Sequence, residues 1–389
     1  MGKPSVSKDR ISLESLNKDT KALLKENIYR QIIMNKIIVY IALISLMACS
    51  QKKENKTEEA SKPIEKTEDI SSEPKIPVTV ENYVRAEGDA GLLAYKKNLG
   101  CFGKLVHQRE FYSVDNQLTV RVNRDTYYSF GVFDLTSPLT IVIPESGDRF
   151  LSMMRINQDH SIFPTIYKAG TYVFTQENIG TRYLSIVFRT FVDESNPDDV
   201  KKAHELQDKI KIEQTDMGTL EVPNWDEESR QKIKDAINVL ANSMSNTRGF
   251  FGEKDKLDPI KHLMGTAYGY GGNPDEDALY FGIIPEKNDG KTAYSLTVKD
   301  VPVDGFWSII IYNADGYMEK NEYNAYSINN ISAKKNDDGS FTINFGGDPT
   351  QDNYLYIVDG WSYMIRLYQP QQELLSGAWE FPKLEEKIN

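Results

Sequence analysis

The stretch that decides the fold is RVNRDTYYSFGVFDL, residues 121–135. Its aromatic and β-branched residues favour a β-strand, but Asn123, Arg124 and Asp125 interrupt the pattern. If residues 118–132 formed one strand, alternation would place Arg124 among apolar side chains and Asp125 on the opposite face. A lone buried charge is costly. Either the strand breaks at residues 123–125, or Arg124 is buried and paired with another acid.

Further strand patterns follow this stretch. LTIVI and FLSMMRI, joined by PESGD, read as a hairpin, and RYLSIVFRTFVD reads as a long strand inside a sandwich. The period then changes, and two helices are expected after Ser195 and around residues 226–244. The apolar stripe of the second helix, which includes Leu240 and Met244, is expected in the core. From Ala278 onward short strands recur between turn residues, which is typical of a sandwich or jelly roll.

The bulk composition agrees with a folded, acidic protein. Hydrophobic residues make up 40% of the 389 residues, which is enough for a core. The formal net charge is −11, and there is no basic stripe, zinc-finger spacing or RNA-recognition motif. Because nucleic-acid binding requires clustered Lys and Arg, no nucleic-acid partner is expected.

The N-terminal part contains a targeting signal. MNKIIVYIALISLMACS, residues 34–50, has a positive start, a short apolar run and a small-residue end that meets Cys49. Leu46-Met47-Ala48-Cys49 resembles a bacterial lipobox, in which the cysteine is lipidated. The polar segment that follows is expected to be a flexible linker. We therefore expect a lipid-anchored protein of the bacterial cell envelope, periplasmic or surface-facing, with the membrane as a partner through Cys49.

Two groups of motifs carry a family resemblance. NRDTYYSFGVFDL, PESGDRF and FRTFVD resemble the bacterial family called domain of unknown function 1254. DGFWSIIIYNADGYM, NEYNAYSI, DDGSFTINF and RLYQPQQELLSGAWEFP resemble its usual companion, domain of unknown function 1214. The resemblance implies a mainly β protein with two β-sandwich, jelly-roll-like domains joined by a helical segment. It implies no established reaction and no catalytic residues.

These observations predict the following organisation of the chain. The predicted parts are a start extension from a start codon placed too early (1–33), a lipoprotein signal peptide (34–49), a disordered linker (50–77), a first β domain (78–195), a helical bridge (196–246) and a second β domain (247–389).

The motifs of common catalytic sites are absent from the sequence. There is no HExxH or His-x-His spacing, so no metal or cofactor is expected. There is no G-x-S-x-G elbow, and Ser129 and Ser327 have no neighbouring histidine in the sequence. Cys101 is expected to be buried rather than reactive.

Charged and aromatic residues within apolar strands are the candidate site residues. Each can belong to a structural polar network or line a pocket, and the structural interpretation is favoured for the Arg124–Asp125 pair. Arg366 places a charge in an apolar strand, as Arg124 does, whereas Trp307 and Tyr312 fit a core. The candidates are Asn123, Arg124, Asp125, Tyr127, Tyr128, Trp307, Tyr312, Tyr326 and Arg366.

Three functions stay open on this basis. The first is binding of a small molecule, glycan or protein partner in a cleft within or between the domains. The second is a hydrolase on the same scaffold without a sequence-local motif. The third is a structural envelope protein that forms homo-oligomers through exposed sheet faces. A polar groove lined by aromatic residues without a nucleophile–base pair would favour binding, and a pocket where Arg124, Asp125 and Tyr127 converge with a Ser–His or acid pair would favour the enzyme.

Overall fold

The computed structural model describes residues 74–117, 120–244 and 246–387. These residues belong to one compact unit, residues 72–389. The predicted start extension, the signal peptide with Cys49, and the linker up to residue 73 lie outside the described residues. Near the first described residue, Ile76 pairs with Trp225 in an isolated β-bridge.

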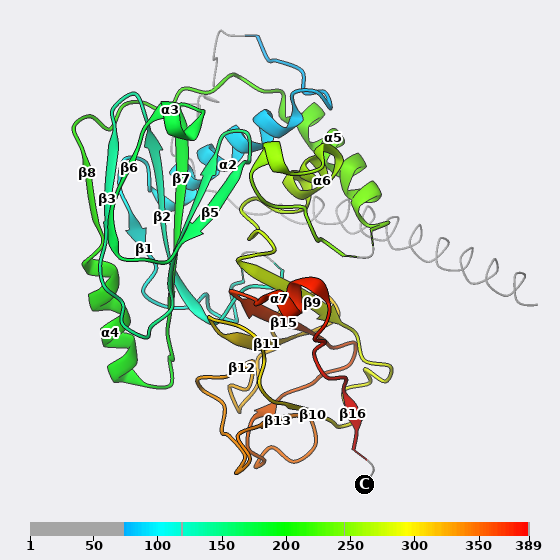
Figure 1. The fold of residues 1–389 in the computed structure, drawn as a ribbon. Helices are drawn as coiled ribbons and strands as arrows, with labels where there is room; N and C mark the ends of the chain where they lie inside the picture. The colour runs from blue at the N-terminus through cyan, green and yellow to red at the C-terminus, as the bar shows by residue number, and fades with distance from the viewer. Residues whose placement is uncertain (1–73, 118–119, 245, 388–389) are drawn as a thin grey trace, which may run out of the picture. The chain divides into compact units, whose positions relative to one another are not determined.

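The first β-sandwich contains two sheets (Figure 1). Buried apolar side chains such as Phe133, Ile141 and Phe188 pack between them. The larger sheet has the order β1 (Val106–His107), β2 (Thr126–Asp134), β7 (Tyr183–Phe191), β4 (Leu151–Asn157) and β5 (Ile162–Ile166), and the smaller one β6 (Gly170–Phe174), β3 (Leu139–Ile143) and β8 (Lys211–Gln214).

The second β-sandwich contains two sheets of four strands. Its core includes Trp361, Phe345 and Ile365. One sheet has the order β12 (Ser327–Asn329), β11 (Trp307–Tyr312), β15 (Ser362–Tyr368) and β9 (Ala278–Ile283), and the other β14 (Tyr354–Leu355), β13 (Phe341–Phe345), β10 (Tyr294–Val298) and β16 (Glu385–Glu386).

Side-chain caps begin several of the helices. Asn196, Asp226 and Asp258 accept hydrogen bonds from backbone N–H groups of the first turns of α4, α5 and α6, which supplies partners for otherwise unpaired donors. The helices are α2 (Tyr83–Leu99), α3 (Gln176–Ile179), α4 (Pro197–Asp208), α5 (Glu227–Ala241), α6 (Pro259–Tyr268) and α7 (Gln372–Ser376), with a 3₁₀ turn at Lys254–Lys256.

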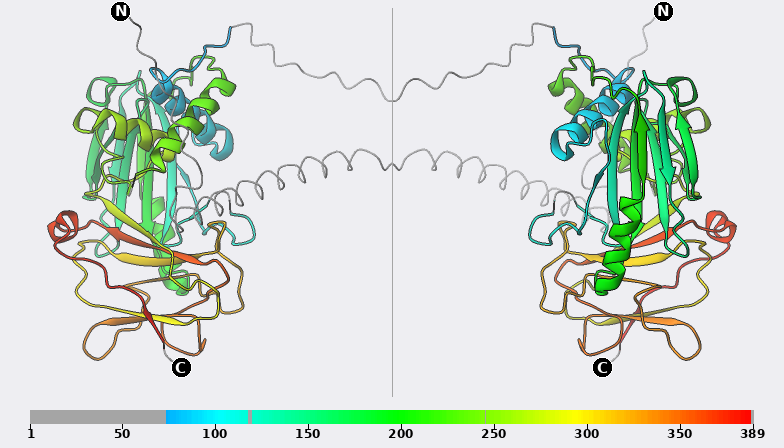
Figure 2. Two further views of the ribbon diagram at one scale, coloured as in Figure 1. Left: turned by 90° about the vertical axis from the view of Figure 1, so that its right-hand side faces the viewer. Right: turned by 90° about the vertical axis from the view of Figure 1, so that its left-hand side faces the viewer.

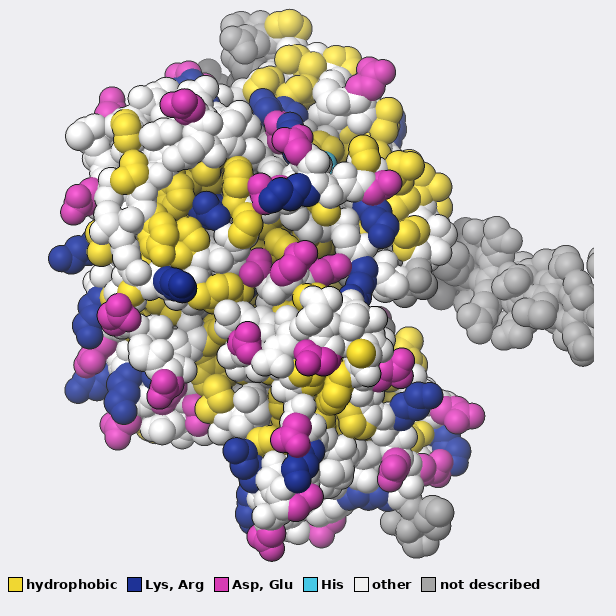
Figure 3. Space-filling view, in the orientation of Figure 1, with side chains coloured by type: hydrophobic (Ala, Val, Ile, Leu, Met, Phe, Trp, Pro, Cys, Tyr) yellow, Lys and Arg dark blue, Asp and Glu magenta, His cyan; other side chains and the backbone are white. Residues whose placement is uncertain are grey.

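Helices α2, α5 and α6 lie together beside the first sandwich (Figures 1 and 2). Hydrophobic side chains are exposed over α5 and α6 in the space-filling view (Figure 3). Leu240 is 59% exposed and Met244 40% exposed, so the prediction that both lie in the core is wrong. The stripe of α5 is wider than the surface covered by α2 and α6, and only Ile237 and Ala241 of this helix are buried.

The predicted fold class is confirmed, because the protein is mainly β and forms antiparallel sandwiches joined through helices. The segment predicted as a helical bridge, residues 196–246, contains α4 and α5 and also β8, which pairs with β3. Its boundaries stay a prediction. None of the helices in the described part of the chain is both long and apolar enough to cross a membrane.

The strand break anticipated in the opening stretch occurs. Strand β2 begins at Thr126, and residues 121–125 form an irregular segment with Arg121 in the left-handed region at φ 55°. The Arg121 N–H donates to Gly316 O at 2.8 Å, which ties this segment to the second sandwich. The other alternative, that Arg124 is buried and paired with an acid, holds in part. Arg124 is half-buried and pairs with Glu194 at 3.5 Å.

Candidate functional site

The two sandwiches meet through the outer faces of two sheets. In the first sandwich, Tyr128 of β2 lies directly opposite Arg189 of β7. In the second, Arg366 of β15 lies between Tyr280 of β9 and Ser308 of β11. Because side chains alternate along a strand, these residues project away from the sandwich interiors. The irregular segment 121–125 lies between the two faces.

Asp125 joins the two sandwiches. It is fully buried, and its Oδ2 accepts a hydrogen bond from Ser308 Oγ at 2.6 Å. Burial raises the pKa of the Asp125 carboxyl, while nearby Arg366 and the hydrogen bond from Ser308 act in the opposite direction. The carboxyl therefore holds its proton more readily than an exposed aspartate does.

Arg366 connects to the same segment from the second sandwich. Its Nη2 donates to Arg121 O and to the Tyr312 hydroxyl, both at 2.8 Å. The Tyr312 hydroxyl in turn donates to Val122 O at 2.9 Å. These bonds occupy Nη2 of the Arg366 guanidinium and fix its orientation.

Two adjoining cavities lie at this junction. The first, of about 330 Å³, is lined by Arg121, Asn123, Tyr128, Arg189, Tyr280, Arg366 and Tyr368, with Tyr112, Val122 and Phe130. The second, of about 700 Å³, shares Arg121, Tyr280 and Arg366 with the first. We refer to the two together as the arginine cleft. The charged residues that line it within the described chain are Arg121, Arg189 and Arg366, and no carboxylate residue is among its lining residues.

Two of these arginines keep buried nitrogens without a hydrogen-bond partner among the described residues. The nitrogens are Arg121 Nη1 and Arg366 Nη1. The Arg189 guanidinium lies over the Tyr128 ring, 5.5 Å from its centroid, and the residue is only 7% exposed. Since arginine stays protonated in proteins, the cleft carries buried positive charge that the protein itself leaves partly unmatched.

The tyrosine hydroxyls of the cleft can also donate hydrogen bonds to a ligand. Asn123 Oδ1 accepts from the Asp125 N–H at 2.8 Å, which sets the orientation of the amide. Asn123 Nδ2 therefore donates to the hydroxyls of Tyr128 and Tyr368, at 3.2 and 3.1 Å. Asn273 Nδ2 likewise donates to the hydroxyl of Tyr280 at 2.6 Å. Each hydroxyl thus accepts a hydrogen bond and retains its own proton for donation.

Burial keeps the two most enclosed of these tyrosines protonated. It raises the pKa of Tyr280 and of Tyr368 above the ordinary value for a phenol. Neither residue can act as a base near neutral pH. The cleft is consequently rich in donors from guanidinium and phenol groups, which suits a negatively charged ligand that offers several acceptors.

The predicted candidates separate into three places. Asn123, Tyr128 and Arg366 line the arginine cleft, and Asp125 and Tyr312 lie behind it. Trp307 packs against Phe341 in the core of the second sandwich. The remaining candidates, Arg124, Tyr127 and Tyr326, form a separate cluster.

The separate cluster is built around Glu194. Its carboxylate pairs with Arg124 and accepts a hydrogen bond from the Tyr127 hydroxyl at 2.9 Å. The Arg124 guanidinium lies over the ring of Tyr326, 5.1 Å from its centroid, and over the ring of Phe111. Arg124, Asp125 and Tyr127 therefore do not converge on one pocket, because the strand break turns Asp125 toward Ser308 instead.

The sequence interpretation missed Arg121, Arg189, Tyr280 and Tyr368. Arg189 was the one that could have been found, because it interrupts a nine-residue strand, YLSIVFRTF, whose residues are all buried. The same reasoning that singled out Arg366 applies to it. Tyr280 and Tyr368 carry no such signal, since tyrosine is common in strands.

The structure also reveals a Ser–His contact that the sequence spacing hid. His107 of β1 pairs with Ser129 of β2, and His107 Nδ1 lies 2.7 Å from Ser129 Oγ. Gln207 Nε2 donates to the same oxygen at 3.2 Å. Ser129 is fully buried and lines none of the cavities described here. The contact is a structural network rather than a nucleophile that can meet a substrate.

Other reactive groups in the described residues are held in inert states. Burial raises the pKa of the Cys101 thiol to about 11, so the thiol is protonated. Burial lowers the pKa of His160 to about 3, with a smaller effect from His262. His160 Nδ1 contacts Thr266 Oγ1 and its Nε2 accepts from the Gly271 N–H, both at 3.0 Å. No group of three or more His, Cys, Asp or Glu residues in the described chain could hold a metal ion.

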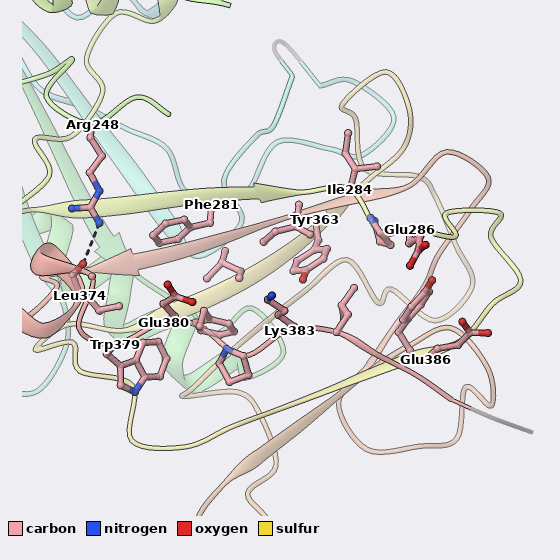
Figure 4. Close-up of a pocket in the computed structure, with 18 residues that line it drawn as sticks. Arg248, Phe281, Ile284, Glu286, Tyr363, Leu374, Trp379, Glu380, Lys383 and Glu386 are labelled. Atoms are coloured by element: carbon pink, nitrogen blue, oxygen red, sulfur yellow. Dashed lines mark hydrogen bonds between the residues drawn. The ribbon is translucent and has the colours of Figure 1, made fainter. Parts of the chain in front are cut away.

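The second sandwich has a pocket of its own, of about 680 Å³ (Figure 4). Phe281, Tyr363 and Trp379 provide apolar walls, and Glu286, Glu380, Lys383 and Glu386 provide charges of both signs. Arg248 at one end donates to the carbonyls of Leu374 and Leu375. None of the buried partnerless atoms lies on the described residues that line this pocket. We refer to it as the sandwich pocket.

Comparisons with known proteins place the fold. Residues 102–214 match the family described as "Protein of unknown function (DUF1254)", and residues 285–372 match "Protein of unknown function (DUF1214)". Together the two matches cover just over half of the chain. No match was found among curated proteins.

Two solved structures are similar to this chain. The crystal structure of the VPA0106 protein from Vibrio parahaemolyticus aligns with a TM-score of 0.61 and 18% identity, over 79% of this chain and 98% of that one. A putative uncharacterized protein from Burkholderia cenocepacia aligns with a TM-score of 0.45 and 12% identity, over 82% of this chain and 91% of that one. The first of these likenesses supports the fold and says nothing about activity.

Proposed function

This chain belongs to the family of proteins that join DUF1254 to DUF1214, and on that premise we propose that it binds a small anionic molecule in the arginine cleft. The ligand class is a carboxylate, phosphate or sulfate. The observation that carries the proposal is the pair of buried guanidinium nitrogens, Arg121 Nη1 and Arg366 Nη1, that have no partner among the described residues. A buried donor without an acceptor costs about 1–3 kcal/mol, and more when it is charged.

The charge balance of the cleft supports the same ligand class. Arg121, Arg189 and Arg366 carry three positive charges, and Asp125 behind them supplies at most one negative charge. The cleft is therefore positive whether or not Asp125 is protonated. Elsewhere in this acidic protein, half-buried arginines such as Arg149 and Arg230 pair with carboxylates. An incoming anion would supply the missing charge and acceptors.

The cleft also meets the criterion set for a binding protein rather than a hydrolase. It is a polar concavity with aromatic walls, and burial raises the pKa of Tyr280 and Tyr368, so both phenols are already protonated near neutral pH and cannot take up a further proton. The Ser–His contact among the described residues is buried elsewhere. The hydrolase alternative has no supporting observation of this kind.

The proposal is tested by measuring thermal unfolding of the purified full chain in phosphate, sulfate and acetate at constant ionic strength. A ligand that binds the native state raises the melting temperature in a saturable manner. Phosphate and sulfate also stabilise proteins by exclusion from the surface, so the decisive comparison is with Arg366→Met. Loss of a charge-assisted donor should weaken binding roughly 10- to 100-fold.

Arg248→Met is the matched control, because it removes a half-buried arginine from the sandwich pocket and leaves the cleft unchanged. Its anion affinity should equal that of the wild type. The proposal fails if no anion shows saturable stabilisation, or if Arg366→Met binds as well as the control.

We further propose that the protein is displayed at the bacterial cell envelope through lipidated Cys49. This part is supported by the lipobox-like sequence Leu46-Met47-Ala48-Cys49 after an apolar run. Mass spectrometry of the mature N-terminus tests it. A peptide that spans residues 48 and 49 in the mature protein would overturn it.

A further inference from the structure

The larger cavity of the arginine cleft differs chemically from the smaller one. Its lining away from the shared arginines is mostly apolar and contains no acidic or lysine side chain among the described residues. The apolar part is provided by Ala241, Met244, Phe250, Phe251, Tyr268 and Met364. Arg121 and Arg366 stand where this lining meets the smaller cavity. An anion held by these arginines would therefore have an apolar space of about 700 Å³ beside it.

A glycine-rich loop, residues 269–272, borders this space directly after α6 ends at Tyr268. Gly269, Gly271 and Gly272 all line the larger cavity. A Cβ at Gly272 would lie 2.4 Å from the Phe251 ring, whereas a Cβ at Gly269 would meet nothing within 4 Å. The loop thus forms a wall without side chains at Gly269, and the cavity stays empty there.

The loop is also held in place. The Gly271 N–H donates to Nε2 of His160, which is fully buried and kept neutral by burial. The Tyr270 hydroxyl bonds Ser185 Oγ at 3.2 Å, and its ring packs edge-on against Tyr95. These contacts fix the loop to the first sandwich, so the apolar cavity exists before any ligand enters.

From this arrangement we infer that the ligand is an anionic amphiphile, with a carboxylate or phosphate bound by Arg121 and Arg366 and an apolar chain or ring system in the larger cavity. The inference rests on the proposed function and names the ligand class of the same site. Ligand pockets commonly combine apolar walls with a few well-placed polar groups. Here the arginines lie at one end of the larger cavity and the apolar side chains line the rest. This arrangement favours a ligand with its charge at one end and an apolar part at the other.

The experiment is a calorimetric titration of the full chain with straight-chain carboxylates from acetate to decanoate, kept below their micelle concentrations. Each methylene that enters an apolar site contributes roughly a threefold to fourfold gain in affinity. We expect the dissociation constant to fall by about that factor per methylene over several members of the series. Decanol, which lacks the charge, should bind at least tenfold more weakly than decanoate.

Gly269→Leu separates the two cavities. Its backbone φ of −173° is extended and accepts any residue, and the added side chain projects into the open space. This variant should bind phosphate and acetate as the wild type does and lose the gain with chain length. Ser376→Leu, on exposed α7, adds the same side chain away from the cleft and should behave as the wild type does.

The possible outcomes distinguish the inferred amphiphilic ligand from the proposed anion-binding function. If phosphate and acetate bind in an Arg366-dependent manner but decanoate binds no better than acetate, the inference of an amphiphilic ligand is wrong. The proposed anion-binding function is then still supported. The inference is equally wrong if Gly269→Leu retains the full chain-length dependence. If none of these anions binds, or if decanol equals decanoate and Arg366→Met has no effect, the proposed function fails as well.

Discussion

The arginine cleft and the sandwich pocket hold cavities of nearly equal volume, about 700 and 680 Å³, yet they differ in what their walls lack. The sandwich pocket is lined by apolar rings, its charges are of both signs, and its half-buried arginine, Arg248, donates to two carbonyls. The charged residues of the cleft are all arginines, and two of them keep a buried nitrogen without a hydrogen-bond partner among the described residues. The two regions therefore differ in their buried unpaired donors rather than in cavity size, and each such donor calls for an explanation.

The same contrast separates the cleft from the rest of the protein. Arg149 pairs with Asp199, Arg182 with Asp134, and Arg230 with Glu87. Such pairing is the usual way in which buried guanidinium groups are accommodated. Arg121, Arg189 and Arg366 have no comparable partner at the cleft surface. At this junction the protein accepts an energetic cost that Arg149, Arg182 and Arg230 avoid by pairing with carboxylates.

The largest effect is expected from Asp125→Ala. This change removes the acceptor of Ser308 and the carboxyl nearest Arg366, and it leaves both groups buried at the junction of the sandwiches. Removal of one member of a buried polar network costs about 3–5 kcal/mol. Glu380→Ala, an exposed acid on the rim of the sandwich pocket, should stay within about 0.5 kcal/mol. Urea unfolding measures both, and equal losses would contradict the distinction between the two regions.

An intermediate effect is expected from acid, through His160. Its folded-state pKa is about 3, below the unfolded value of 6.5, so the unfolded chain binds a proton first as the pH falls. The stability that His160 contributes is present above pH 6.5 and is lost as the pH falls toward 3, by about 1.4 kcal/mol per pH unit, so that about 3 kcal/mol is lost at about pH 4. In His160→Asn, whose side chain tolerates the left-handed backbone at φ 52°, this dependence should disappear. Parallel stability–pH curves for the two proteins would show that His160 is not the group responsible.

The smallest effect is expected from Tyr368→Phe. This change removes a hydroxyl of the cleft that accepts from Asn123 and retains a proton to donate. Loss of one neutral hydrogen bond should raise the dissociation constant for phosphate roughly 2- to 10-fold. Tyr363→Phe is the counterpart in the sandwich pocket and should leave phosphate binding unchanged. If both variants bind phosphate as the wild type does, the phenol of Tyr368 is not part of the anion site.

The sequence predicted parts of the candidate site and missed others for identifiable reasons. Arg366 stood out because a charge in an apolar strand needs an explanation, and it does line the cleft. Arg189 satisfied the same criterion and was overlooked. Arg124 drew attention for the same reason, but its pairing with Glu194 and stacking on Tyr326 place it in a separate cluster.

By itself, the sequence determined the β class, the two family motifs and the choice posed by Asn123–Asp125, because these depend on local alternation and on the cost of a lone charge. Only the tertiary structure decided where the charged groups meet. The Asp125–Ser308 bond joins residues 183 positions apart, and the Arg366–Arg121 bond joins residues 245 positions apart. Alternation tells which face of its own strand a side chain takes. It carries no information about which distant face will pack against it, and the arginine cleft exists only at that contact.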